Sequence, residues 1–271
     1  MPADLTFTAK GWPHHHTQAT PTPDHSDPVA FSRTRLHFQP DPKQTTVLQS
    51  TANRGILNCS RQWGKSTVTA AKAVHRAFTQ PESLILVATP GERQSAEFLR
   101  KAAAMVRKLK LPVRGDGDNS LSLQFPNGSR IVGLPGTEAT VRGFSAVSLL
   151  IIDEASRVKD EMYQSLRPML AVGEGDLWLM STPNGQRGFF YDVWHSADPD
   201  WFRVTVPATE CSRISAKFLA SERRQMRPET FEQEYMCAFT VSDSAFFDPQ
   251  LIDDAIDLSI PQLRVPGYRG L

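Results

Sequence analysis

The stretch that decides the fold covers nine residues, Cys59-Ser60-Arg61-Gln62-Trp63-Gly64-Lys65-Ser66-Thr67. A short apolar run, residues 55–57, precedes it, and an alanine-rich run of helical character follows it. A strand, a tight loop and a helix in this order are typical of a phosphate-binding P-loop, in which a lysine reaches the β- and γ-phosphates and a hydroxyl holds Mg²⁺. Lys65 and Ser66 fill these two roles, so the stretch predicts a nucleoside triphosphate site.

One position departs from the pattern G-x-x-x-x-G-K-[ST]. Cys59 stands where the first glycine is expected, five residues before Gly64. The loop alone therefore does not define the class of nucleotide-binding protein. The residues predicted to contact the nucleotide here are Ser60, Arg61, Gln62, Trp63, Gly64, Lys65, Ser66 and Thr67.

A second motif lies further along the chain, where the apolar run 149–152 ends in Asp153 and Glu154. A buried parallel strand delivers such a carboxylate to the edge of the sheet where ligands bind, so Asp153 and Ser66 are the expected Mg²⁺ ligands. Glu154 is the candidate general base for the attacking water. Alone, the pair could be an ordinary helix cap, but the two motifs occur together in the expected order.

Strand-like and helix-like segments alternate from about residue 31, which predicts an α/β fold with a mostly parallel sheet flanked by helices. We expect strands at residues 56–59, 84–89, 149–153 and 177–181, and helices at residues 65–78, 92–109, 161–170, 216–226 and 229–237. An Asn127-Gly128 turn between residues 121–125 and 130–134 predicts an antiparallel hairpin extension. The strand expected at residues 84–89 is an extra one between the two motifs. Together with the glutamate after Asp153, it favours a P-loop NTPase of the additional-strand, catalytic-glutamate type.

Composition sets broader limits. The 271 residues include 30 basic and 29 acidic side chains, so any polyanion site must be local. The three cysteines have no metal-ligand spacing, and the longest apolar run is too short to cross a bilayer, so we expect no membrane partner. Residues 1–30 are rich in Pro and His and predict a disordered tail, followed by an ATPase domain at residues 31–247.

Four further segments carry a family resemblance. Residues 38–44, which end in Gln44, resemble an adenine-recognition segment, and the P-loop itself is similar to the deviant loop of phage packaging motors. Ser181-Thr182-Pro183-Asn184-Gly185 resembles the coupling motif of those motors, and residues 231–235 agree as well. Together, residues 31–247 resemble the ATPase domain of the large terminase subunit of tailed bacteriophages and prophages.

This resemblance implies an ATP-hydrolysing motor that moves double-stranded DNA into a procapsid in the cytoplasm of the bacterial host, with ATP and Mg²⁺ as cofactors. It also implies the portal protein and the small terminase subunit as partners. The chain would form a homo-oligomeric ring when assembled and would be a monomer in isolation. Ser181, Thr182 and Pro183 would couple hydrolysis to movement. Gln44 would read adenine, with an ordinary helix-start glutamine as the alternative. Arg142 or Arg61 would be the arginine finger, presented to a neighbouring subunit.

Residues 248–271 resemble the start of a linker toward a nuclease domain that has no room in 271 residues, so we expect no nuclease activity. An isolated domain, a separately encoded nuclease and a decayed prophage gene are all compatible with this. Two other functions stay open: a helicase-like DNA motor, and a degenerate nucleotide-binding or assembly protein. Candidate DNA contacts are the basic residues Arg100, Lys101, Arg107, Lys108, Lys110, Arg223, Arg224 and Arg227.

Overall fold

The computed structural model describes residues 23–112, 121–135, 143–241 and 255. The strands in these ranges form one seven-stranded sheet in the order β3-β4-β2-β5-β6-β1-β7. All neighbouring pairs are parallel except β3 and β4. Their bounds are β1 (Arg54–Cys59), β2 (Leu84–Thr89), β3 (Ser122–Gln124), β4 (Arg130–Pro135), β5 (Val147–Asp153), β6 (Asp176–Ser181) and β7 (Trp201–Val206). The predicted mixed α/β fold and its hairpin extension are confirmed.

The centre of the sheet holds the strands that carry the motifs. β6 pairs with β1 on one side and with β5 on the other, so it is the strand inserted between the two motif strands in space. β2, which lies between them along the chain, pairs with the far side of β5. All six residues of β2 are buried, which is the continuous apolar pattern of a parallel strand covered on both faces.

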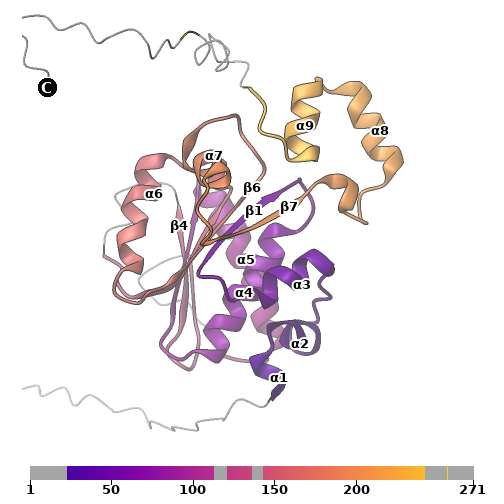
Figure 1. Ribbon diagram of the computed structural model, residues 1–271. Coiled ribbons are helices and arrows are strands. Elements are labelled where there is room, and N and C mark those ends of the chain that lie inside the picture. Colours follow the sequence, from indigo (N-terminus) through magenta and orange to yellow (C-terminus); the bar gives the residue numbers. More distant parts are fainter. Residues whose placement is uncertain (1–22, 113–120, 136–142, 242–254, 256–271) are drawn as a thin grey trace, which may run out of the picture.

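Helices cover both faces of the sheet (Figure 1). One face packs against α2 (Pro28–Thr34), α3 (Pro42–Gln49), α4 (Lys65–Thr79) and α5 (Glu92–Lys108). The other packs against α6 (Asp160–Leu166), the 3-10 turn Arg167–Leu170 and α7 (Gly188–His195). Side chains alternate between the two: Leu57 and Ile151 lie in the first core, Ile56 and Ile152 in the second.

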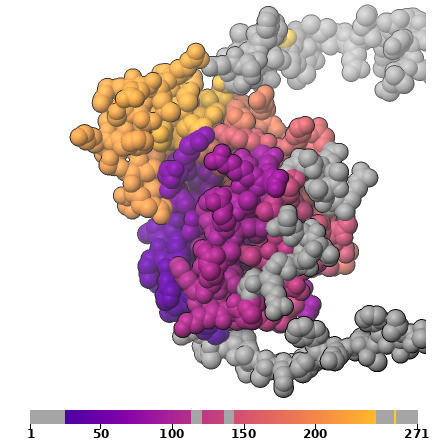
Figure 2. Space-filling view, turned by 180° about the vertical axis from the view of Figure 1, so that it is seen from behind, coloured from indigo at the N-terminus to yellow at the C-terminus, as the bar shows by residue number. Residues whose placement is uncertain are grey.

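A small lobe follows β7 and has its own apolar cluster. It contains the 3-10 turn Ala208–Glu210, α8 (Ala216–Gln225) and α9 (Pro228–Met236). Figure 2 shows it, in orange, projecting beyond the body beside the indigo surface of the N-terminal segments. Lys43 on α3 pairs with Glu210 of this lobe at 3.6 Å, which joins the two parts.

The predicted tail ends too late in the sequence. Its last residues form α1 (Pro23–Ser26) and the start of α2. The Asp27 carboxylate caps α2 by accepting a bond from the Val29 N–H at 2.9 Å, and Val29 and Phe31 are buried. These two apolar side chains give the segment enough buried surface to order it, so the tail prediction is wrong for residues 23–30. Residues 1–22 lie outside the described part of the chain.

The predicted helices agree with the structure with one change. The segment 161–170 is an α-helix only to Leu166 and then continues as a 3-10 turn, because Pro168 has no N–H to donate within the helix. The prediction missed α1, α2, α3, α7 and β7. No helix in the described ranges is long and apolar enough to span a membrane.

A buried lysine joins α3 to α4. The Lys72 ammonium donates to the carbonyl oxygens of Ser50 at 3.0 Å and Val47 at 3.5 Å, at the end of α3. It also lies 4.4 Å from the centroid of the Trp178 ring. That ring packs against Gly55, where a Cβ atom would come within 2.6 Å of it. Burial is the main cause that lowers the pKa of Lys72 from 10.5 to about 8.

We expect Lys72 to make stability depend on pH in the alkaline range. Below pH 8 the side chain is protonated in both the folded and the unfolded chain and adds no pH dependence. Between pH 8 and 10.5 the unfolded chain holds a proton that the folded chain has lost, so folding stability rises with pH. Relative to Lys72→Met, the free energy of unfolding should rise by about 2 kcal/mol between pH 7.5 and pH 10. Urea unfolding of both proteins at the two pH values measures this, and a constant difference would contradict it.

Candidate active site

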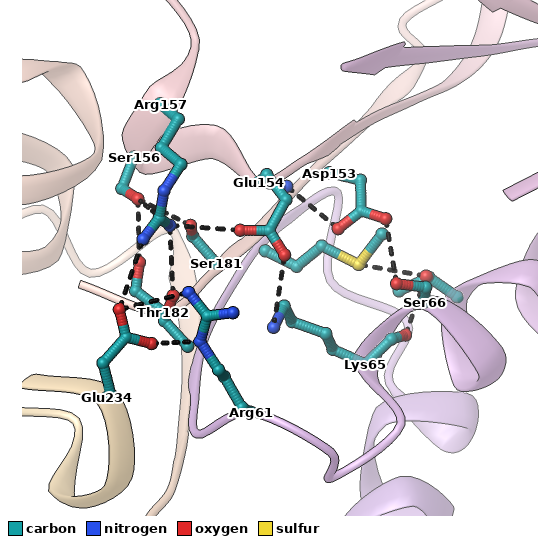
Figure 3. A network of polar contacts seen from close by, with 12 residues as sticks. Arg61, Lys65, Ser66, Asp153, Glu154, Ser156, Arg157, Ser181, Thr182 and Glu234 are labelled. Atoms are coloured by element: carbon teal, nitrogen blue, oxygen red, sulfur yellow. Dashed lines mark hydrogen bonds and ion pairs between the residues drawn. The ribbon is translucent and has the colours of Figure 1, made fainter. Parts of the chain in front are cut away.

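The carboxyl ends of three neighbouring strands, β5, β6 and β1, meet at one edge of the sheet. In the pairing register Asn58 lies opposite Ser181, and Asp153 lies opposite Met180, so the three ends are level. Figure 3 shows side chains from these ends turned toward one another. This edge is where open α/β sheets bind ligands.

The P-loop, residues 59–67, bends through two left-handed residues, Gln62 with φ 66° and Gly64 with φ 95°. Gly64 directly precedes α4, whose N-terminus has no side-chain cap. The N–H groups of the first turn of a helix have no partner within the helix, so this end offers donors and a positive dipole to an anion. The strand, loop and helix therefore lie as the motif predicts.

A second group of residues fixes the loop from behind. Trp63 is buried, its carbonyl oxygen accepts a bond from Gln44 Nε2 at 3.1 Å, and its Nε1 donates to Asp41 Oδ2 at 3.0 Å. Arg213, from the lobe, also donates to the Trp63 carbonyl oxygen. Gln44 and Asp41 further exchange two bonds as the capping box of α3. Both ends of the Gln44 amide are thus used within the protein, which is the helix-start alternative, and an adenine contact stays a prediction.

The two predicted metal ligands are in contact. Ser66 Oγ donates to Asp153 Oδ2 at 2.9 Å, and Asp153 is 5% exposed. Burial raises the pKa of Asp153, and the neighbouring Glu154 charge raises it further, while Lys65 and the Ser66 bond lower it. A divalent cation would favour the charged carboxylate, and a hydroxyl with a carboxylate suits Mg²⁺, which keeps several waters. Within the described ranges no three His, Cys, Asp or Glu residues gather as a metal cage.

Glu154, the candidate base, follows the strand in a left-handed conformation with φ 54°. Its N–H donates to Asp153 Oδ1 at 2.9 Å. The two carboxylate oxygens face different cations: Oε1 lies 3.5 Å from Lys65 Nζ, and Oε2 accepts a bond from Arg157 at 3.2 Å. The residues predicted from the two motifs are therefore brought together, and in this structure the base is paired.

Arg157 and Glu234 are among the residues of the site that were missed from the sequence. Arg157 donates to Thr182 Oγ1 at 3.2 Å and pairs with Glu234 at 3.5 Å (Figure 3). Glu234, on α9, also binds Arg61 through both carboxylate oxygens, and this bond raises the pKa of Arg61. The only sequence signals were the position of Arg157 one helical turn after Glu154 and the place of Glu234 in the segment 231–235.

The segment predicted for coupling is tied to two elements. Ser181 Oγ lies 2.7 Å from Ser156 Oγ, which donates to the Thr182 carbonyl oxygen at 2.8 Å. On the other side, the Gly185 N–H donates to Gln233 Oε1 of α9 at 3.1 Å. Ser181, Thr182 and Pro183 are buried. The segment thus contacts Ser156, which follows β5, and α9 of the lobe, while its coupling role stays a prediction.

The remaining predicted residues have varied positions. The Ser60 hydroxyl is buried and has no bonding partner among the described atoms, while Gln62 is exposed and Thr67 is half-buried in the first turn of α4. Arg142 lies outside the described residues, so its role as a finger stays a prediction. Arg61 remains available as the alternative, with 58% of its side chain exposed.

The family described as "Terminase large subunit, T4likevirus-type, N-terminal" matches residues 56–253 of the chain. Among curated proteins, the terminase large subunit of Escherichia phage T5 is 24% identical over 220 residues, which cover 78% of this chain and 50% of that protein. The terminase large subunit of Thermus phage G20c is 26% identical over 174 residues, covering 57% of this chain and 36% of that protein. The chain thus spans about half, or less, of these relatives' lengths.

Solved structures show the same fold. The large terminase ATPase domain of Thermus phage P74-26 superposes with a TM-score of 0.70 at 21% identity, and the match covers 78% of this chain and 97% of that domain. The large terminase of bacteriophage HK97 superposes with a TM-score of 0.66 at 18% identity, over 79% of this chain and 55% of that protein. The fold of these neighbours agrees with the described seven-stranded sheet.

The bond between Asp41 and the buried Trp63, which holds the P-loop, should contribute measurably to stability. Asp41→Ala removes both the cap of α3 and the acceptor for the buried Trp63 N–H, so we expect a loss of about 2–3 kcal/mol in the free energy of unfolding. Asp27→Ala, which removes only the cap of α2, is the matched control and should cost about 1 kcal/mol. Denaturant unfolding compares the two variants. Equal losses would show that the bond between Asp41 and Trp63 contributes nothing.

Proposed function

The chain belongs to the family of terminase large subunits, and we propose that it is an ATP-hydrolysing motor that moves double-stranded DNA into a viral procapsid. One observation carries this proposal: Lys65, Ser66, Asp153 and Glu154 converge at the uncapped N-terminus of α4. This is the set that binds and hydrolyses a triphosphate in P-loop enzymes.

Each residue has a distinct role in the proposed chemistry. Lys65 would bind the β- and γ-phosphates of ATP, and Ser66 with Asp153 would hold Mg²⁺, which supplies charge neutralisation on the phosphates. Glu154 would orient the attacking water and accept its proton. A triphosphate would draw Lys65 away from Glu154, because phosphate and carboxylate compete for the same ammonium. That exchange would free one oxygen of the base.

An arginine from a neighbouring subunit would complete the site, since such a residue stabilises the charge that develops on the phosphates. We keep Arg142 and Arg61 as the two candidates. Arg61 would first have to leave Glu234. A finger supplied in trans fits a homo-oligomeric ring and a weak ATPase as an isolated monomer.

The proposed partners are double-stranded DNA, the portal protein of the procapsid and the small terminase subunit, in the cytoplasm of the bacterial host. A motor holds the DNA through its phosphates without reading bases. On α5, Arg107 is exposed, whereas Arg100 pairs with Glu97 and Lys108 donates to the Leu36 carbonyl oxygen. On α8, Arg223 pairs with Glu232 and Arg224 is exposed. These helices remain the candidate DNA contacts.

Two substitutions test the catalytic assignment. Lys65→Ala should abolish ATP turnover by weakening nucleotide binding. Glu154→Gln should keep nucleotide binding while turnover falls by about 10²- to 10⁴-fold, because the variant keeps the phosphate-binding Lys65 and loses the proton acceptor. Phosphate release from radiolabelled ATP and binding of a fluorescent ATP analogue measure the two effects. Lys217→Ala, at an exposed position of α8, is the control. Unchanged turnover in both variants would overturn the site.

A further substitution separates the two roles of Gln44. Since its amide holds the P-loop through Trp63, Gln44→Met should weaken ATP and GTP binding by the same factor, about 3- to 10-fold for the loss of one such bond. Calorimetric titration with each nucleotide gives the two factors, and Gln49→Met, at the exposed end of the same helix, is the control. A loss confined to ATP would instead support adenine recognition by Gln44.

A further inference from the structure

Charged side chains of alternating sign form a continuous series of ion pairs across the site, called here the ion-pair chain. Lys65 pairs with Glu154, Glu154 with Arg157, Arg157 with Glu234, and Glu234 with Arg61. Both ends of the ion-pair chain, Lys65 and Arg61, belong to the P-loop (Figure 3). A triphosphate that binds the P-loop therefore competes for cations at both ends of one connected network.

Arg157 occupies the centre of the ion-pair chain and reaches three separate elements. It donates to Glu154 after β5 at 3.2 Å and to Thr182 after β6 at 3.2 Å, and it pairs with Glu234 on α9 at 3.5 Å. Its side chain is 31% exposed, so the residue is not part of a core whose loss would unfold the protein. A planar guanidinium can bond several partners at fixed angles, which an ammonium cannot do.

The pairing of Glu154 shows why Arg157 matters for catalysis. Lys65 holds Oε1 and Arg157 holds Oε2 of the carboxylate. Once Lys65 turns to a phosphate, Arg157 is the one cation of the pair that still fixes the orientation of Glu154. A base held by one oxygen keeps its other oxygen for water, whereas a base held by neither is free to rotate away.

We propose that Arg157 is a positioning residue that orients Glu154 once the site is filled and that links the site to α9 through Glu234. This inference rests on the proposed ATPase function. Glu234 joins α9 to the P-loop directly. Its carbonyl oxygen accepts a bond from the Arg61 N–H at 3.3 Å, and its carboxylate binds the Arg61 side chain. A change in the pairing of Glu234 reaches the whole of α9, which shares one apolar cluster with α8.

The first test is kinetic. Arg157→Met should lower kcat for ATP by about 10²-fold, the loss expected when a catalytic group is misplaced, with KM changed less than about 3-fold because Arg157 contacts Glu154 and lies outside the P-loop. Arg157→Lys, which keeps the charge but loses the planar guanidinium, should recover part of kcat. Glu232→Gln is the matched control, since it breaks an arginine–glutamate pair between α8 and α9 outside the site, at 3.3 Å.

The second test follows α9 by amide hydrogen exchange, with and without a non-hydrolysable ATP analogue. We expect the analogue to change the exchange of residues 228–236 in the parent chain, and to change it less than half as much in Arg157→Met and in Glu234→Gln. An unaltered kcat in Arg157→Met, or a full exchange response in both variants, would overturn the inference while leaving the ATPase intact. If the parent chain neither binds nor hydrolyses ATP, the proposed function itself fails. Thermal melting of each variant shows whether it is folded.

Discussion

The parallel pairing of β6 with both β1 and β5 is the constraint on which the rest of the site depends. β6 brings the ends of the three strands level, so that Ser66, at the start of the helix after β1, can donate to Asp153 at the end of β5. Parallel neighbours require crossover connections, and here the helices on both faces supply them and bury the strands. The chemistry at the edge is thus a consequence of strand order. A register shift of one residue in β6 would turn Ser181 to the opposite face and break its contact with Ser156.

The P-loop gains its shape from neighbours on two sides. From α3, Gln44 and Asp41 hold the buried Trp63, and from the lobe, Arg213 bonds the same residue. Cysteine at the position of the first glycine already restricts the backbone more than glycine would, and these external bonds restrict the loop further. The lobe therefore does more than extend the fold. Through Arg213 and Glu234 the lobe contacts Trp63 and Arg61 of the loop, so a movement of the lobe would displace residues of the predicted phosphate site.

The sequence predicted those parts of the site that depend on local order along the chain. Lys65, Ser66, Asp153 and Glu154 were found because each follows a recognisable strand, and the hairpin was found because Asn127-Gly128 specifies its turn. Arg157 and Glu234 were missed because their pairing joins residues 77 positions apart and exists only after α9 has docked. Trp63 was predicted as a nucleotide contact, which stays a prediction; its side chain is buried and donates to Asp41, a contact that the sequence did not reveal. The predicted disordered tail extends too far along the sequence. The prolines near Val29 and Phe31 suggested disorder, although these two residues belong to the short helix α2.

Charge compensation stabilises the buried charges of the site. Lys65 and Asp153 are 7% and 5% exposed, and buried charges of this kind destabilise a fold unless they are paired. Glu154 supplies the partner for Lys65, while Ser66 and the Glu154 N–H satisfy Asp153. A triphosphate would then replace an existing ion pair and would not create one from nothing, so its affinity reflects the difference between two pairings. In the proposed mechanism the same exchange would give the base a condition for action, because Glu154 would lose Lys65 when a phosphate takes its place.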